Sequence, residues 1–175
     1  SDVRVSGVSV SGCMTRGIDL GLNGQTLVES CLVNTVGNYG IIASVVSKST
    51  AYDCATYAIT ASTATECVGY ATTNGMPGGI GIFAQYSAEN CLGLSLGGYG
   101  MYVGTLNSGA AQNCSGMSLG SGFAGGTGLF AHNADTCVGQ SDGNSPALSA
   151  WTESPEPGMS TSRTVSAIPV PSTSL

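Results

Sequence analysis

Seven cysteines recur along the chain, and their types and spacing limit the chemistry they can perform. A thiol can act as a nucleophile, bind a metal ion or form a disulfide. No Cys-x-x-Cys pair and no Cys/His pair at metal-ligand spacing occurs. The last three intervals between cysteines are 24, 23 and 23 residues, which indicates a repeated structural role. The seven residues are Cys13, Cys31, Cys54, Cys67, Cys91, Cys114 and Cys137.

The other groups that could support catalysis are few and scattered. His132 is the only histidine, and no two of the aspartates are adjacent in the sequence. There is no nucleophile elbow and no phosphate-binding loop. The cations are too few to neutralise an acidic polysaccharide; they are Arg4, Arg16, Lys48 and Arg163. We therefore predict a protein that is not an enzyme and that has no catalytic residues and no cofactor.

Half of the acidic residues lie one or two positions before a cysteine. Stacked carboxylates repel one another, and calcium bound by oxygen ligands from neighbouring repeats would relieve that repulsion. The simpler hypothesis is a solvated acidic edge that discourages lateral aggregation. We favour the solvated edge, with calcium as the alternative. The residues concerned are Glu29, Asp53, Glu66, Glu89 and Asp135.

The segments between the cysteines must position them, and they have the pattern of short strands. Most repeats contain a glycine followed by an apolar residue, with a second apolar residue two positions later, as in Gly40-Ile41 and Gly81-Ile82. This period of two is typical of a strand with one buried face. A small apolar residue precedes every cysteine by three positions. Three longer stretches, residues 21–27, 44–50 and 104–110, are expected to form outward loops.

Strands this short cannot bury a face alone, but stacked turns of chain can. Each strand would pair in parallel with its equivalent one turn away, at about 4.8 Å. The seven cysteines would then point inward at a bend and form one column of small, polarisable side chains. The residue before each is often of a type that tolerates left-handed turns. Free buried thiols are favoured, and disulfides between successive turns are the alternative.

The phrase "AENCLGLSLGGYGM" (residues 88–101) carries a family resemblance. It resembles the repeats of right-handed parallel β-helix proteins, the pectate-lyase-like superfamily, and is similar to Cys/Gly-rich tandem-repeat surface proteins of environmental bacteria. The resemblance covers roughly residues 3 to 143. It implies an all-β, right-handed parallel β-helix, a solenoid of about six to seven rungs. This architecture hosts lyases, hydrolases, phage tailspikes, adhesins and passive scaffolds.

Two regions are predicted. Residues 1–143 form the parallel β-helix. Residues 144–175 contain five of the six prolines, the only tryptophan and no cysteine, which favours an extended Pro/Ser-rich arm.

The amino-acid composition argues against some classes of binding partner. Only 8% of the residues are charged and the net charge is −6, so nucleic acid is an unsuitable partner. No stretch approaches the eighteen or so apolar residues of a membrane span. The scarcity of lysine and the abundance of serine, threonine and glycine favour an extracellular or cell-surface location.

The first residues already follow the repeat pattern, which predicts an open end on the β-helix. We expect a structural protein that forms a homo-oligomer by end-to-end stacking and arm exchange, as a filament subunit or a surface scaffold. The expected contacts are Val3, Val5, Val8, Val10, Trp151, Ile168 and Val170. The alternative is a glycan-binding adhesin or a phage tailspike or fibre module that uses the tyrosines near the bends. A polysaccharide lyase or hydrolase is the least favoured hypothesis.

Overall fold

The computed structural model describes residues 2–73, 78–105, 108–120, 126–142 and 145–150. These residues form strands, turns and bends and contain no helix. All the pairings between named strands are parallel, and they build two long sheets. The prediction of an all-β protein with parallel pairing is confirmed.

The first sheet contains eleven strands, of which eight follow one another across the sheet. In spatial order these are β1 (Val3–Ser6), β4 (Thr26–Glu29), β6 (Tyr39–Ser47), β8 (Tyr57–Thr65), β10 (Ile80–Glu89), β12 (Tyr99–Val103), β15 (Leu129–Ala131) and β18 (Leu148–Ala150). Three further strands lie beside this row: β3 (Arg16–Gly21), β13 (Ala110–Gln112) and β16 (Asn133–Asp135).

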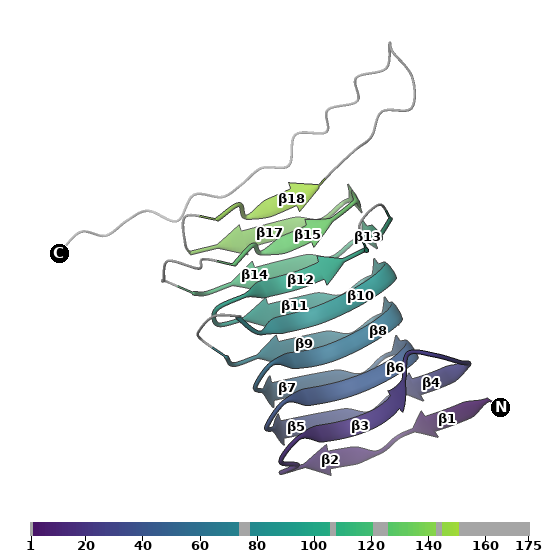
Figure 1. Ribbon diagram of the computed structural model, residues 1–175. Helices are drawn as coiled ribbons and strands as arrows, with labels where there is room; N and C mark the ends of the chain where they lie inside the picture. The colour runs from purple at the N-terminus through teal and green to yellow at the C-terminus, as the bar shows by residue number, and fades with distance from the viewer. Residues whose placement is uncertain (1, 74–77, 106–107, 121–125, 143–144, 151–175) are drawn as a thin grey trace.

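The second sheet contains seven strands. In spatial order they are β17 (Val138–Ser141), β14 (Ser115–Ser118), β11 (Leu92–Ser95), β9 (Val68–Ala71), β7 (Thr50–Cys54), β5 (Leu32–Val36) and β2 (Ser9–Ser11). Along the sequence the chain passes from the first sheet to the second and back, and each pass adds one layer to both sheets (Figure 1). This arrangement is compatible with a β-helix-like solenoid.

In each full turn of the chain around the stack, the strand in the first sheet is either continuous or split in two. The long strand β6 pairs with β3 along its first part and with β4 along its second part. In the same way β10 pairs with both β12 and β13. The expected loops at 21–27 and 104–110 therefore include the breaks in split strands. The expected loop at 44–50 is wrong, because β6 continues to Ser47.

One column of large apolar side chains occupies the space between the sheets. Its members are the apolar partners of the predicted Gly-apolar pairs, with Ala58-Ile59 as the one variant, and the parallel register places each above the preceding one. Their side chains are at most 7% exposed, because the second sheet covers them. The column consists of Ile18, Ile41, Ile59, Ile82, Met101 and Leu129.

Glycines of the second sheet face this column at close range. A Cβ at Gly69 would lie 2.7 Å from Cγ1 of Ile82, and one at Gly116 would lie 2.8 Å from Cβ of Leu129. Real Cβ atoms do not approach other carbons so closely. The glycines are therefore required by the spacing of the two sheets, since a side chain there would overpack the interior.

The first sheet continues beyond the predicted boundary at residue 143. Strand β18 lies within the segment expected to be an extended arm, yet it pairs in parallel with β15, with Leu148 opposite Leu129. The rest of the expected arm, residues 151–175, lies outside the described residues. In the part of the chain that the structure describes, no helix is long and apolar enough to span a membrane.

Candidate functional site

The turn that leads from the first sheet to the second, here called the first corner, is the most regular feature of the chain. The first corner consists of two residues each time the chain passes from the first sheet to the second. The first has a positive φ, between 48° and 67°. In order, the pairs are Gly7-Val8, Ser30-Cys31, Lys48-Ser49, Glu66-Cys67, Asn90-Cys91, Asn113-Cys114 and Thr136-Cys137.

The positive φ has a different cost at each first corner. Glycine adopts this conformation freely, and asparagine tolerates it better than most residues. Glu66 (φ 53°) and Thr136 (φ 54°) lack those advantages, and Thr136 is also β-branched. The surrounding backbone hydrogen bonds hold them in place; for example, the N–H of Glu66 donates to the carbonyl of Glu89 at 2.9 Å.

At six of the seven first corners the second residue is a cysteine or serine whose side chain is held by a hydrogen bond; the exception is Val8, which is 41% exposed. The thiol of Cys91 donates to the carbonyl of Glu89 at 3.1 Å, two residues earlier, and the thiols of Cys67 and Cys114 make the equivalent bond at 3.2 Å. The backbone N–H of Cys67 donates to Sγ of Cys91, one turn further along, at 3.5 Å. The column therefore connects successive turns through sulfur as well as through the sheets.

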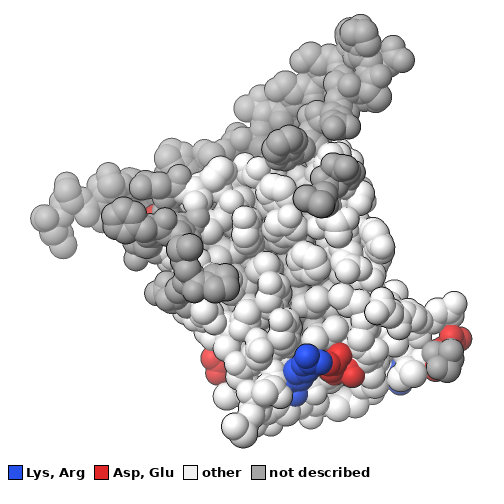
Figure 2. Space-filling model, in the orientation of Figure 1, with Lys and Arg blue, Asp and Glu red and all other residues white. Residues whose placement is uncertain are grey.

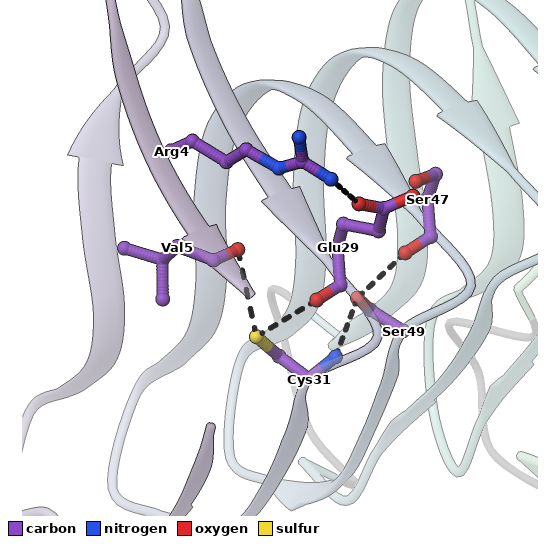
Figure 3. A network of polar contacts seen from close by, with 6 residues as sticks. All are labelled: Arg4, Val5, Glu29, Cys31, Ser47 and Ser49. Atoms are coloured by element: carbon purple, nitrogen blue, oxygen red, sulfur yellow. Dashed lines mark hydrogen bonds and ion pairs between the residues drawn. The ribbon is translucent and has the colours of Figure 1, made fainter. Parts of the chain in front are cut away.

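Ser49 takes the place of a cysteine in this column (Figure 3). Its hydroxyl donates to the carbonyl of Ser47 at 2.8 Å and accepts the backbone N–H of Cys31 at 3.1 Å. The thiol of Cys31 lies 3.3 Å from the carbonyl oxygen of Glu29. Ser49 is 1% exposed, so a buried hydroxyl makes the same two hydrogen bonds as a thiol.

Two of the seven cysteines do not belong to this column, which corrects the expected single column. Cys13 and Cys54 lie at the opposite end of the second sheet, at the turn that returns to the first sheet, here called the second corner. Cys54 is in register with Val36 on one side and Ala71 on the other. The column at this corner comprises Cys13, Val36, Cys54, Ala71, Ser95, Ser118 and Ser141.

All seven cysteines are free thiols, and five of them are buried; Cys13 and Cys137 are half-buried. Desolvation, followed by the charge of Asp53, raises the pKa of Cys54 to about 12. At Cys91 a hydrogen bond with Cys114 lowers the pKa, but the bond with Cys67 and burial outweigh it and raise the pKa to about 12. A protonated thiol is a poor nucleophile and a poor metal ligand, so burial and the raised pKa disfavour both roles for these two thiols.

The acidic residues are not brought together. Glu29, Glu89 and Asp135 share one column, but serine, threonine or glutamine side chains separate them, while Glu66 lies at the first corner and Asp53 at the second. Glu29 forms an ion pair with Arg4. No group of three His, Cys, Asp or Glu side chains able to hold a metal ion occurs within the described residues.

A shallow hollow of about 390 Å³ lies at the second corner near the N-terminal end of the stack. Its lining includes Cys13, Thr35, Asp53 and Thr72. It contains a single thiol and a single carboxylate, and no histidine, lysine or arginine lines it. His132 lies elsewhere, between β15 and β16, and is half-buried.

Aromatic side chains form two ladders on the outer face of the first sheet. Tyr39 and Tyr57 stack at 5.1 Å with an interplanar angle of 10°, and the guanidinium of Arg16 covers Tyr39 at 5.7 Å. Tyr102 stacks between Phe83, at 5.6 Å, and Phe130, at 4.7 Å. The ring faces are thus occupied by one another. Figure 2 shows that the surface over β8, β10 and β12 carries no charged side chain in this view.

The residues expected to mediate self-assembly are four valines near the N-terminus and three residues near the C-terminus. Val3 is 43% exposed and Val8 is 41% exposed, at the edges formed by β1 and the first corner that follows it. Val5 and Val10 are partly buried against the core. Trp151, Ile168 and Val170 lie outside the described residues.

Comparisons of the chain with protein-family models, with curated proteins and with solved structures found no match.

Proposed function

We propose that the chain is a right-handed parallel β-helix protein with a non-enzymatic, extracellular structural role, and that it self-associates end to end as a filament subunit or surface scaffold. The observation that carries this proposal is that, among the described residues, the strands at the two ends of the stack have a sheet partner on one side only. Strands β1 and β2 end the two sheets on one side, and β17 and β18 end them on the other. Exposed strand edges pair readily with other strands.

The distribution of reactive groups supports a structural role. The acids are separated, the hollow at the second corner contains one thiol and one carboxylate but no histidine, lysine or arginine, and Cys54 and Cys91 have raised pKa values. Acid–base and nucleophilic catalysis both require groups within hydrogen-bond reach of one another. The described residues offer a regular scaffold instead, because each turn repeats the geometry of the previous one.

The glycan-binding alternative has weaker support. Sugars stack on the free faces of aromatic rings, whereas the rings of Tyr39 and Tyr102 have neighbours on both faces. These ladders contribute cross-strand stabilisation of a kind that aromatic pairs provide in any sheet. We therefore assign them to the stability of the stack.

Sedimentation velocity over a hundredfold range of concentration tests the proposal, with electron microscopy of the same samples. We expect the sedimentation coefficient to rise with concentration and elongated particles one stack wide to appear. Two deletions separate the contributions of the C-terminal region: removal of 151–175 retains β18, whereas removal of 147–175 deletes it. A monomer at every concentration in the intact chain would overturn the proposal.

A further inference from the structure

The outer face of the second sheet, here called the second-sheet face, is formed by two columns of side chains. Buried and outward residues alternate along its strands, so two residues of each strand point away from the core. None of these outward residues is charged. The columns are Ser9, Leu32, Thr50, Val68, Leu92, Ser115 and Val138, and Ser11, Asn34, Tyr52, Tyr70, Leu94, Met117 and Gln140.

Large apolar side chains on the second-sheet face remain exposed. Leu32 and Val68 are each 39% exposed, and Tyr52 and Leu92 are each 40% exposed. The two columns, with the corner residues beside them, approach the roughly 20–30 residues that one partner contributes to a standard protein–protein interface. A contiguous apolar surface without charge, on a chain whose net charge is −6, is typical of a site for association with a protein.

The charges beside β7 indicate which protein fits this face. Lys48 lies at the first corner, just before β7, and Asp53 lies near the other end of the same strand. Both side chains are exposed, and neither forms an ion pair within the described part of the chain. Asp53 also lines the hollow of about 390 Å³, so there is open space beside its carboxylate. A face with opposite charges on its two sides, at one level, is complementary to a copy of itself.

We propose that a second copy of this chain packs against the second-sheet face, side by side with the first, about a two-fold axis parallel to the stack. Such an axis keeps every turn at the same height and places the first corner of one copy against the second corner of the other. Lys48 of each copy then lies beside Asp53 of the other. The pairing is independent of end-to-end association, because it uses a face and leaves the ends of the stack untouched.

The same axis brings apolar side chains together in the middle of the interface. Each column of one copy lies over the other column of its partner, so Val68 faces Tyr70 and Leu92 faces Leu94. Sheets that pack face to face lie about 10 Å apart with their strands within about 30° of one another, which lets these side chains interdigitate. An apolar centre with charged groups at the rim is the usual arrangement in protein–protein interfaces.

Two charge-reversed variants, Lys48→Glu and Asp53→Lys, test the arrangement. Each variant alone brings like charges together twice in every pair, so we expect at least about tenfold weaker pairing. An equal mixture of the two restores both contacts between opposite charges, and we expect it to pair about as tightly as the unaltered chain. Lys48 has a φ of 48°, so lysine can adopt the φ of 55° found at Asp53. Thermal melts check that both variants fold.

Small-angle X-ray scattering measures the pairing through the cross-sectional radius of gyration. This radius grows when stacks pair side by side and stays constant when they extend end to end. A constant radius at every concentration of the unaltered chain overturns the pairing, whereas end-to-end association is judged separately from particle length. A mixture that pairs no better than its two components overturns the two-fold arrangement.

Matched lysine substitutions test the face itself. Leu92 and Val45 are each 40% exposed, but Val45 lies on β6, in the first sheet. Leu92→Lys places two charges in the centre of the interface, and we expect the cross-sectional radius to remain that of a single stack. Val45→Lys should pair like the unaltered chain. Equal effects of the two substitutions would overturn the assignment of the second-sheet face.

Discussion

The two corners of each turn differ in how strictly they are built. The first corner has two residues in every turn, whereas the second corner ranges from two residues, between β5 and β6, to ten, between β14 and β15. Non-glycine residues with positive φ occur at every first corner except Gly7. Around the second corner the described residues with positive φ belong to the N-terminal turns: Gly12 lies in the corner itself, and Thr35 and Asp53 each lie one residue before the end of a second-sheet strand.

The difference shows that backbone geometry, and not side-chain identity, is what repeats at the first corner. Seven residue pairs of varied type adopt the same conformation there. At the six corners from Cys31 to Cys137 the second side chain is small and donates to the carbonyl two residues earlier, which thiol and hydroxyl both do. The second corner uses local solutions, such as Ser95, whose hydroxyl donates to the carbonyl of Gly79 and accepts the N–H groups of Gly97 and Gly98.

Enlarging the first-corner residue should have the greatest effect. Cys91→Leu overpacks the column and leaves the N–H of Cys67 without its sulfur acceptor, so we expect the free energy of unfolding to fall by about 3 kcal/mol. Cys91→Ser should cost less than about 1 kcal/mol, because Ser49 already makes these bonds. Urea denaturation measures both variants, and a Leu variant as stable as the Ser variant would contradict the inward column.

Alkaline pH should destabilise the fold through the buried thiols of both corners. Cys54 and Cys91 have pKa values raised from 9.0 to about 12, so the folded state holds these protons more tightly than the unfolded state. Their contribution to stability is complete below pH 9 and is lost as the pH rises to about 12; by pH 10.5 the loss is on the order of 2 kcal/mol for each thiol. The hydrogen bond with Cys91 lowers the pKa of Cys67, which offsets part of the Cys91 contribution. Urea denaturation at pH 7 and at pH 10.5 measures the fall.

Matched serine variants separate the two corners in this experiment. Cys54→Ser and Cys91→Ser each remove one of these titrating thiols, and each should reduce the dependence of stability on alkaline pH. An unchanged dependence in both variants would assign it to other groups, such as Tyr57, whose pKa burial and the nearby Tyr39 also raise.

Relieving the left-handed strain should have a smaller, stabilising effect. Glu66→Gly removes the cost of a positive φ, although glycine also gains entropy in the unfolded chain, so we expect a net gain of about 0.5 to 1 kcal/mol. Asn90→Gly should be nearly neutral, because asparagine already tolerates this conformation. Thermal melts measure both, and Thr63→Gly, within strand β8, is the control that should destabilise.

Calcium should have the smallest effect. The acids are distributed between the two corners and separated along their column, so neither a chelator nor excess calcium should shift the melting temperature. A rise in melting temperature that saturates with calcium concentration would restore the calcium-bridge alternative, since a ligand that binds only the folded state stabilises it by mass action.

The sequence allowed prediction of the strands and their parallel stacking, because the Gly-apolar pairs mark the buried face directly. The split of the cysteines between two corners was not predicted. The prediction assumed that every cysteine marks the same position. In the structure, Ser49 takes the inward position at the first corner, and Cys54 lies at the second corner. The useful signal was spacing, since Cys31, Ser49 and Cys67 are each 18 residues apart.

The continuation of the first sheet into β18 was also missed. The segment around it is rich in proline and serine, a composition typical of linkers, and a strand of three residues, with Leu148 and Ala150 apolar, is too short to establish a periodicity. Pairing with β15 stabilises β18, and that partner is 19 residues earlier in the sequence. Contacts with a strand already in place can override a weak local preference.

The split strands have a consequence for how this chain can accept new sequence. A break such as the one between Gly21 and Thr26 leaves the side-chain columns on either side in register, because each part is held by its own pairing with β6. Extra residues at this surface position lengthen a loop, and doubling a loop's length costs only about 0.6 kcal/mol. The breaks in split strands are therefore natural points at which a foreign peptide can be displayed at one level of the stack.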